Sequence, residues 1–165
     1  IVFGLCWRIS VKQAVKNHVF YFMVKKLVQR ELNIFDSMPG NILSIEVEEV
    51  GSVGLEIWLS ALAFGAKKVL LLDSFLIPES VENLIQKQIK TAQLILKGLG
   101  FAETCINWIG RKTELTDVLL EKTKAMPKIA EATYFALSDK RKALFYAIDH
   151  LYECAQEPQI GRASV

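Results

Sequence analysis

EVEEVGSVGLEIWLSALAFGAKKVLLLDS, residues 46–74, is the stretch from which the fold prediction starts. A strand-like run reaches a turn that contains Gly51 and Gly54, and an apolar helix-like run then leads to a second strand. Parallel strands are joined by such helical crossovers, and the nearly continuous apolar run of the second strand is typical of a sheet covered on both faces. The stretch therefore predicts a β-α-β unit. Its turn lies where nucleotide-binding proteins often bind a phosphate.

Periodicity along the rest of the chain predicts further elements of the same kind. Strands are expected at residues 1–6, 41–47, 67–73 and 104–110. Helices are expected at residues 10–32, 54–64, 78–99, 114–123 and 139–155, the last of them capped by Ser138, whereas residues 128–137 are ambiguous.

These elements predict a single three-layer α/β domain over residues 1–155. Its four-stranded parallel sheet would be of the Rossmann or flavodoxin-like type, with strand order 2-1-3-4 and flanking C-terminal helices. Residues 156–165 have no periodicity and are expected to form a linker to a further segment of the parent protein.

Size and charge exclude several classes of partner. The 165 residues are 52% hydrophobic, which suits one domain with its own core. Because 20 basic residues are balanced by 18 acidic ones, no nucleic-acid partner is expected. The most apolar run, residues 57–66, is shorter than the roughly 20 residues that cross a bilayer, so no membrane segment is expected. The chain begins with Ile1 and ends at Val165 without a stop-like tail, and we expect it to be part of a longer protein.

The positions of the cysteines and histidines do not indicate a catalytic or metal site. Cys6, Cys105 and Cys154 are odd in number and far apart, so a disulfide framework is not expected and a reducing, cytoplasmic compartment is favoured. No CxxC pair is present, which argues against a structural zinc site. His18 and His150 each fall on an expected helix and are interpreted as packed or surface residues, so no catalytic residue is predicted.

The glycine turn can be interpreted in two ways. Neither GxxxxGK[ST] nor GxGxxG is present, so the two common phosphate-binding motifs are absent. A helix amino terminus still favours anions weakly, but Glu48, Glu49 and Glu56 crowd this point and would repel a phosphate. A tight turn is therefore favoured, with an anion site as the alternative.

A second candidate lies after the strand at residues 67–73. Asp73 and Ser74 would be at the carboxyl edge of the sheet, where open α/β folds usually bind ligands. Asp73 could hold a ribose hydroxyl or a metal there, or it could cap a loop, which is the favoured interpretation. Together with Ser52 and Gly54, these two residues form the candidate cofactor-binding edge.

Residues 49–74, followed by a long helix and LKGLGF, resemble the delta subunit family of methyl-viologen-reducing hydrogenases. The resemblance covers about residues 1–110 and depends on the strand–turn–helix order, the A-x-x-x-GA-x-x-VL-x-L pattern of residues 61–72 and the closing GLG. Members of that family are small iron–sulfur proteins that pass electrons from a hydrogenase to heterodisulfide reductase. The resemblance implies an α/β fold and a role near electron transfer.

The cluster ligands of that family are largely missing here. Its cysteine pair after the first strand falls on Cys6 and Ile9, and its next cysteine falls on Glu49. Its Gly-Cys after the third strand is replaced by Asp73-Ser74, and a later cysteine falls on Glu79. Iron–sulfur clusters are typically held by four thiolates. Cys6 is thus the one candidate metal ligand that remains, and no metal or cluster is expected in this chain.

The expected function combines the fold of that family with the loss of its iron–sulfur cluster. FALSDKRKALFYAIDHL, residues 135–151, resembles the stretch before a 4Fe–4S segment in bacterial ferredoxin-type proteins, whose middle segment this chain would be. The leading hypothesis is a non-catalytic scaffold or docking domain of a cytoplasmic iron–sulfur electron-transfer protein. The clusters would be in the parent protein, and the partners would be neighbouring ferredoxin segments and a formate dehydrogenase or hydrogenase. The alternative is a small-molecule or nucleotide-binding domain, or an enzyme, that uses the carboxyl edge of the sheet.

Overall fold

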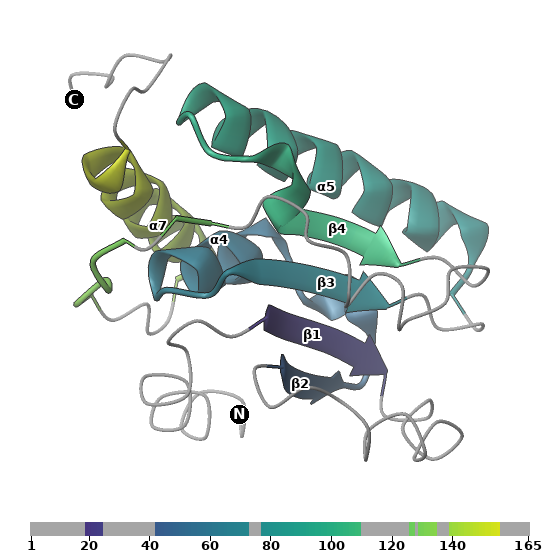
Figure 1. Cartoon of the computed structure of the whole chain (residues 1–165). Coiled ribbons are helices and arrows are strands. Elements are labelled where there is room, and N and C mark those ends of the chain that lie inside the picture. Colours follow the sequence, from purple (N-terminus) through teal and green to yellow (C-terminus); the bar gives the residue numbers. More distant parts are fainter. Residues whose placement is uncertain are drawn as a thin grey trace.

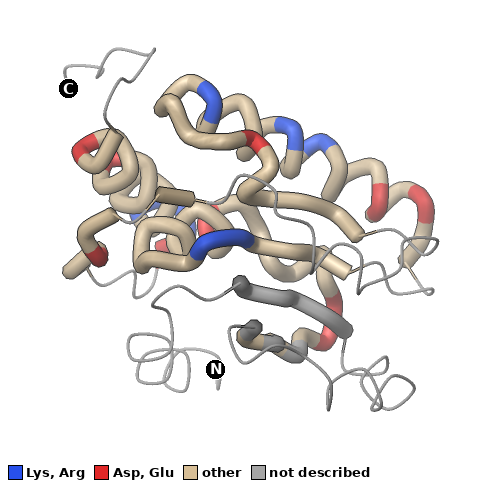
Figure 2. Tube along the Cα trace, in the orientation of Figure 1, with Lys and Arg blue, Asp and Glu red and all other residues tan. Residues whose placement is uncertain are grey.

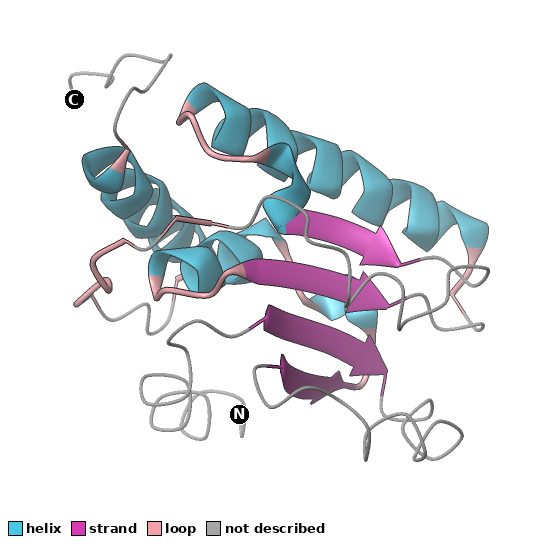
Figure 3. Cartoon of the chain, in the orientation of Figure 1, coloured by secondary structure: helices cyan, strands magenta, loops and turns pink. Residues whose placement is uncertain are grey.

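The computed structural model describes residues 19–24, 42–72, 77–109, 126–127, 129–134 and 139–155. Its strands are β1 (Val19–Val24), β2 (Ile42–Val47), β3 (Lys68–Leu72) and β4 (Ile106–Ile109). Its helices are α4 (Leu55–Ala63), α5 (Glu79–Gly98) and α7 (Lys140–Cys154), with short 3-10 turns η1 (Val50–Ser52) and η2 (Glu103–Cys105) (Figures 1 and 3).

The backbone ladders are all parallel and run in the order β2-β1-β3-β4. Val19 lies opposite Ile42 on one side and Lys68 on the other, so β1 is a central strand. Val69 lies opposite Ile106 at the start of the β3–β4 pair. Side chains are described along the whole of only two strands, β3 and β4.

The predicted fold class, a four-stranded, three-layer domain, is wrong for the described part of the chain. Only β3 and β4, a parallel pair, are described with all their side chains. The three helices α4, α5 and α7 share one hydrophobic core and therefore form one layer rather than two. Val69 and Leu71 of β3 belong to the same core as α4, α5 and α7. Leu70 points to the other face and is buried outside that core. The described residues contain no helix that covers this second face.

The first strand also differs from the prediction. Residues 10–32 were expected to be one helix, but VFYFMV within that range forms β1. Its aromatic and β-branched residues favour a strand, and a continuous apolar sequence fits a central strand as well as a helix that is buried on several faces. The strand expected at residues 1–6, the rest of the expected helix, the helix at 114–123 and the tail at 156–165 lie outside the described residues.

The stretch quoted at the outset folds as its pattern predicts. Its described part runs from the end of β2 through α4 to β3, and α4 ends at Ala63, two residues before Gly65. Gly65 has a φ of 100°, which residues with a side chain rarely adopt, so this glycine allows the chain to turn into β3. Helix α5 begins after Pro78 and ends at Gly98, also as predicted.

The helices bury the faces that their periodicity indicates. Helix α4 is nearly apolar all round and is the centre of the core, where Trp58, Leu59 and Leu62 are fully buried. Helix α5 buries one stripe, and α7 buries a narrower stripe against α4. Those two stripes are Ile85, Ile89, Ala92 and Leu96 on α5, and Ala143, Ala147 and Leu151 on α7.

Helix α7 begins one residue later than predicted, with a different cap. Asp139, not Ser138, is the N-cap residue, and its Oδ1 accepts hydrogen bonds from the backbone amides of Arg141 (2.9 Å) and Lys142 (3.3 Å). Both Ser and Asp are good N-caps, so the sequence leaves the choice between neighbours open.

The ambiguous run at 128–137 is neither helix nor strand where it is described. The Ala132 amide donates to the Ala63 carbonyl oxygen at 3.1 Å, at the carboxyl end of α4. The Met126 amide donates to the Lys67 carbonyl oxygen, and the Lys67 Nζ donates back to the Met126 carbonyl oxygen, each at 3.0 Å. Ala132 therefore pairs with the last residue of α4, and Met126, which precedes the run, pairs with the loop between α4 and β3.

Candidate functional site

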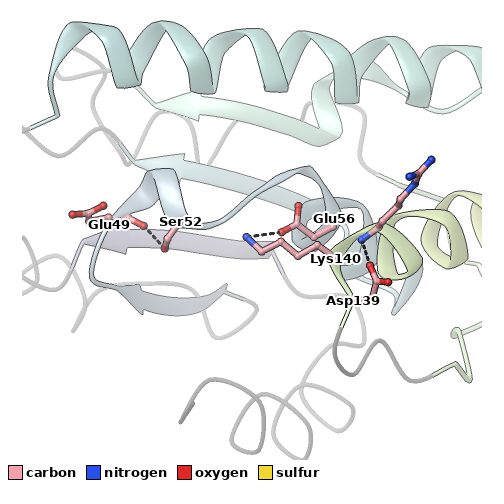
Figure 4. Close-up of polar contacts among 6 residues, drawn as sticks. Glu49, Ser52, Glu56, Asp139 and Lys140 are labelled. Carbon is pink, nitrogen blue, oxygen red and sulfur yellow. Dashed lines mark hydrogen bonds and ion pairs between the residues drawn. The ribbon is translucent and has the colours of Figure 1, made fainter.

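The turn between β2 and α4 is held together by its own polar groups. The Ser52 hydroxyl donates to the Glu49 carbonyl oxygen at 2.7 Å, and the Ser52 amide donates to the same oxygen at 3.1 Å (Figure 4). The flanking Val50 and Val53 are 1% and 2% exposed and anchor the turn in the core. Both hydrogen-bond donors of Ser52 are thus used within the turn.

Gly51 is needed because the turn lies against α5. A Cβ added at Gly51 would come within 3.2 Å of Cγ1 of Val81, on the first turns of α5. That distance is tighter than ordinary van der Waals contact, so a side chain at this position would require the Val81 side chain to shift by a few tenths of an ångström. Gly51 is therefore explained by helix packing, without a ligand.

Gly54 is the N-cap residue of α4, and the Glu56 carboxylate lies directly over it. The φ of Gly54 is −95°, which any residue can adopt, so backbone strain does not require glycine here. A Cβ at this position would instead collide with the carboxylate of Glu56. A negative charge at a helix amino terminus is favourable, because it interacts with the positive end of the helix dipole. Glu56 thus occupies the place that a bound anion would take.

Glu56 also connects α4 to α7. Its Oε1 lies 3.5 Å from the Nζ of Lys140, the first residue of α7 (Figure 4). The Glu56 side chain is only 15% exposed, whereas that of Lys140 is 79% exposed. Oε1 itself is buried and makes no hydrogen bond, so its stabilisation is electrostatic.

The carboxyl end of β2 is acidic and the start of β3 is basic. Glu48 and Glu49 are exposed immediately after β2, and Lys67 and Lys68 stand at the start of β3. Because the strands are parallel, these two groups lie at opposite ends of the sheet, as Figure 2 shows. The turn before α4 therefore presents carboxylates, which repel phosphate and suit hard cations rather than iron–sulfur clusters.

The structure brings together only part of the candidate edge. Ser52 and Gly54 lie in the same turn, but Asp73 and Ser74, which follow β3, are outside the described residues, as is Cys6. Glu79, which matches a cysteine of the hydrogenase family, is the first residue of α5. The proposed four-residue ligand edge therefore remains a prediction.

The two described cysteines differ in surroundings. Cys105 lies in η2 at the amino end of β4 and is fully buried, and burial raises the pKa of its thiol to about 11 despite the nearby Lys68 and Lys67. Cys154 is partly exposed near the end of α7. Neither thiol lies at the carboxyl edge of the sheet.

Cys154 contacts His150, which was not predicted from the sequence. Sγ of Cys154 lies 3.6 Å from Nε2 of His150, and this Nε2 donates to the Ala130 carbonyl oxygen at 2.8 Å. The four-residue spacing, one helical turn, was the signal available in the sequence. Because Nε2 carries the proton given to Ala130, His150 ties residues 129–134 to α7 and cannot use that nitrogen as a base toward Cys154. Across the described ranges, no group of three or more His, Cys, Asp or Glu side chains could hold a metal ion.

No family model matches the chain, and no curated protein matches it. None of the helices in the described part of the chain combines the length and the apolar composition needed to cross a membrane.

Proposed function

We propose that this chain is a non-catalytic scaffold or docking domain of a cytoplasmic iron–sulfur electron-transfer protein. In that role it holds neighbouring ferredoxin segments, or a formate dehydrogenase or hydrogenase, in position for electron transfer. The resemblance to the hydrogenase delta subunit supports the parent class. The pattern of residues 61–72 that carries this resemblance falls on α4 and β3, the most deeply buried elements.

One observation carries the non-catalytic part of the proposal, namely the position of Glu56. Its carboxylate covers Gly54 at the amino end of α4 and pairs with Lys140 of α7. A nucleotide phosphate at this point would have to displace the carboxylate. The same turn gives an iron–sulfur cluster oxygen donors where soft thiolates are required.

The docking role is tested in a parent protein that carries ferredoxin segments on both sides of this chain. Deletion of residues 1–155 is expected to lower the rate of electron transfer to the redox partner at least tenfold, while the iron content of the ferredoxin segments is unchanged. Equal rates with and without residues 1–155 would remove the proposal.

The absence of a cluster is tested separately. The chain, purified without oxygen, is expected to be colourless and to contain no stoichiometric iron or acid-labile sulfide. A brown preparation whose charge-transfer band disappears in Cys6→Ser would make the chain an electron carrier and would contradict a purely structural role.

A further inference from the structure

Helix α7 carries two cations next to two exposed aromatic rings. Phe145 is 57% exposed and Tyr146 is 47% exposed. Arg141 and Lys142, one helical turn earlier, are exposed as well. Residues three and four apart on a helix are neighbours on its surface, so these side chains form one continuous patch. The α7 patch is defined by these four residues.

Among the described residues, the two cations of the α7 patch have no ion-pair partner. Neither Arg141 nor Lys142 forms a salt bridge there. Lys140 does not belong to the patch, because its ammonium group already pairs with Glu56. Asp139, which precedes these residues, directs Oδ1 at the backbone amides of Arg141 and Lys142 and serves as the helix cap. The patch therefore offers two positive charges at its amino-terminal side.

The acidic residues of α7 lie beyond the two rings. Asp149 is one turn past Phe145, and Glu153 is one turn further. Both have interactions of their own within the chain. The groups that α7 leaves for a partner are therefore the two cations and the two rings.

The patch is partly ordered before any partner arrives. The Tyr146 ring lies 5.6 Å from that of Tyr134, which in turn lies 5.1 Å from that of Phe64 on α4. The Arg141 guanidinium lies over the Phe145 ring, 5.8 Å from its centre. A guanidinium in such a contact retains its N–H donors, whose planar fork matches a carboxylate. Side chains that are already packed lose less conformational entropy when they bind.

We propose that the α7 patch binds an acidic segment of a partner protein. The Arg141 guanidinium donates two hydrogen bonds to one carboxylate of that segment, and the Lys142 ammonium group pairs with a second. An apolar side chain between the carboxylates covers the rings of Phe145 and Tyr146. This inference specifies the surface used in the docking role proposed above, and it rests on that role.

The small number of unpaired cations favours a protein segment over other anionic partners. Proteins that bind nucleic acid typically neutralise about six to ten phosphates. Segments that bind an anionic membrane carry clusters of about four to eight basic residues. The α7 patch has two cations, which suit a pair of carboxylates. Arginine and aromatic residues are also enriched in protein–protein interfaces.

The expected binding is weak and sensitive to salt. Exposed ion pairs contribute at most about 1 kcal/mol each, and the two rings add a small apolar area. We expect a dissociation constant on the order of 100 μM at low ionic strength. Salt screens exposed charges, so the affinity should fall as the salt concentration rises.

Fluorescence anisotropy of a labelled acidic peptide tests the proposal on the full chain. The probe has a central Phe-Leu pair with two glutamates on each side, and its counterpart has glutamines in place of the glutamates. The acidic probe is expected to bind at least tenfold more tightly than the counterpart, because only its carboxylates pair with the two cations.

Variants of the patch separate its charge from its geometry. Arg141→Glu and Lys142→Glu are each expected to weaken binding of the acidic probe at least tenfold. Arg141→Lys keeps the charge but lacks the planar fork, so a loss of about threefold is expected. Lys90→Glu, an equal charge reversal at an exposed position of α5, is the matched control and should bind as the wild type does. Far-ultraviolet circular dichroism checks that each variant remains folded.

Electron transfer in the parent protein distinguishes failure of this surface from failure of the docking role. The double variant Arg141→Glu/Lys142→Glu is expected to lower the rate as the deletion of residues 1–155 does. A deletion that lowers the rate while the double variant leaves it unchanged would overturn the α7 patch and keep the docking role. A deletion without loss would remove both.

The binding experiments also have outcomes that overturn the proposal. These are no binding of the acidic probe up to about 1 mM, equal binding of the glutamine counterpart, or Arg141→Glu that binds as the wild type does. Binding to phosphatidylcholine vesicles that contain phosphatidylserine, without binding to the probe, would overturn it in favour of a membrane surface.

Discussion

Glu56 and Lys140 join the amino ends of α4 and α7, with 3.5 Å between Oε1 and Nζ. The pair lies beside Gly54, so one carboxylate interacts with the amino end of α4, occupies the space that a side chain at position 54 would take and contacts the next helix. This combination explains a glycine-containing turn without a phosphate.

Removing the charge of Glu56 should weaken the fold. In Glu56→Gln the interaction with the helix dipole and the pairing with Lys140 are both lost, and we expect a decrease of about 0.5–1.5 kcal/mol in the free energy of unfolding. Urea denaturation measures the change. Glu48→Gln, an exposed residue outside the helix, is the control and should change stability little. Equal losses in the two variants would show that Glu56 has no special role.

Gly54→Ala should be costly only while Glu56 is present. The new methyl group forces the Glu56 carboxylate away, so we expect a loss of about 1 kcal/mol in the wild-type background. In a Glu56→Ala background the space is open and the φ of −95° suits alanine, so the loss should be smaller than in the wild-type background. Equilibrium unfolding of all four proteins gives the coupling. Additive effects would contradict the contact.

Gly65→Ala should be costly in any background. At a φ of 100° the methyl group strains the backbone whatever space surrounds it, and we expect a loss of about 1–2 kcal/mol. The thermal unfolding midpoint, compared with that of Ala66→Gly next to it, separates backbone strain from general loss of packing. A variant as stable as the wild type would show that the turn into β3 adapts.

Alkaline conditions should destabilise the protein partly through Cys105. The folded state raises the pKa of this thiol to about 11, so the folded protein keeps a proton that the unfolded chain has released. The stabilising contribution is therefore present at neutral pH and is lost as the pH rises from the ordinary thiol value to about 11, by on the order of 2 kcal/mol.

Cys105→Ala isolates this contribution from that of lysines and tyrosines, which titrate in the same range. The difference in unfolding free energy between wild type and Cys105→Ala should shrink from pH 8 to pH 10.5. A difference that stays constant over this interval would mean that the buried thiol does not titrate as expected.

Local patterns were sufficient for much of the secondary structure. The alternation of apolar runs and turn residues gave β2, α4, β3, α5 and β4 close to their observed bounds, because each depends on neighbours within a few residues. The buried stripe of α5 follows helical periodicity for the same reason. The six residues of β1 were misassigned, since an apolar run without clear alternation fits a buried helix as well as a central strand.

The candidate site was likewise predictable only in part from the sequence. The sequence alone indicated that Glu48, Glu49 and Glu56 make the turn before α4 unfavourable for phosphate, because their charges and their closeness in the chain are explicit. Only tertiary structure revealed that Lys140 reaches Glu56. It also showed that the described helices form a single layer in which α4 packs against both α5 and α7. Contacts between residues far apart in the chain depend on how whole elements pack, and no local periodicity encodes which helix lies beside which.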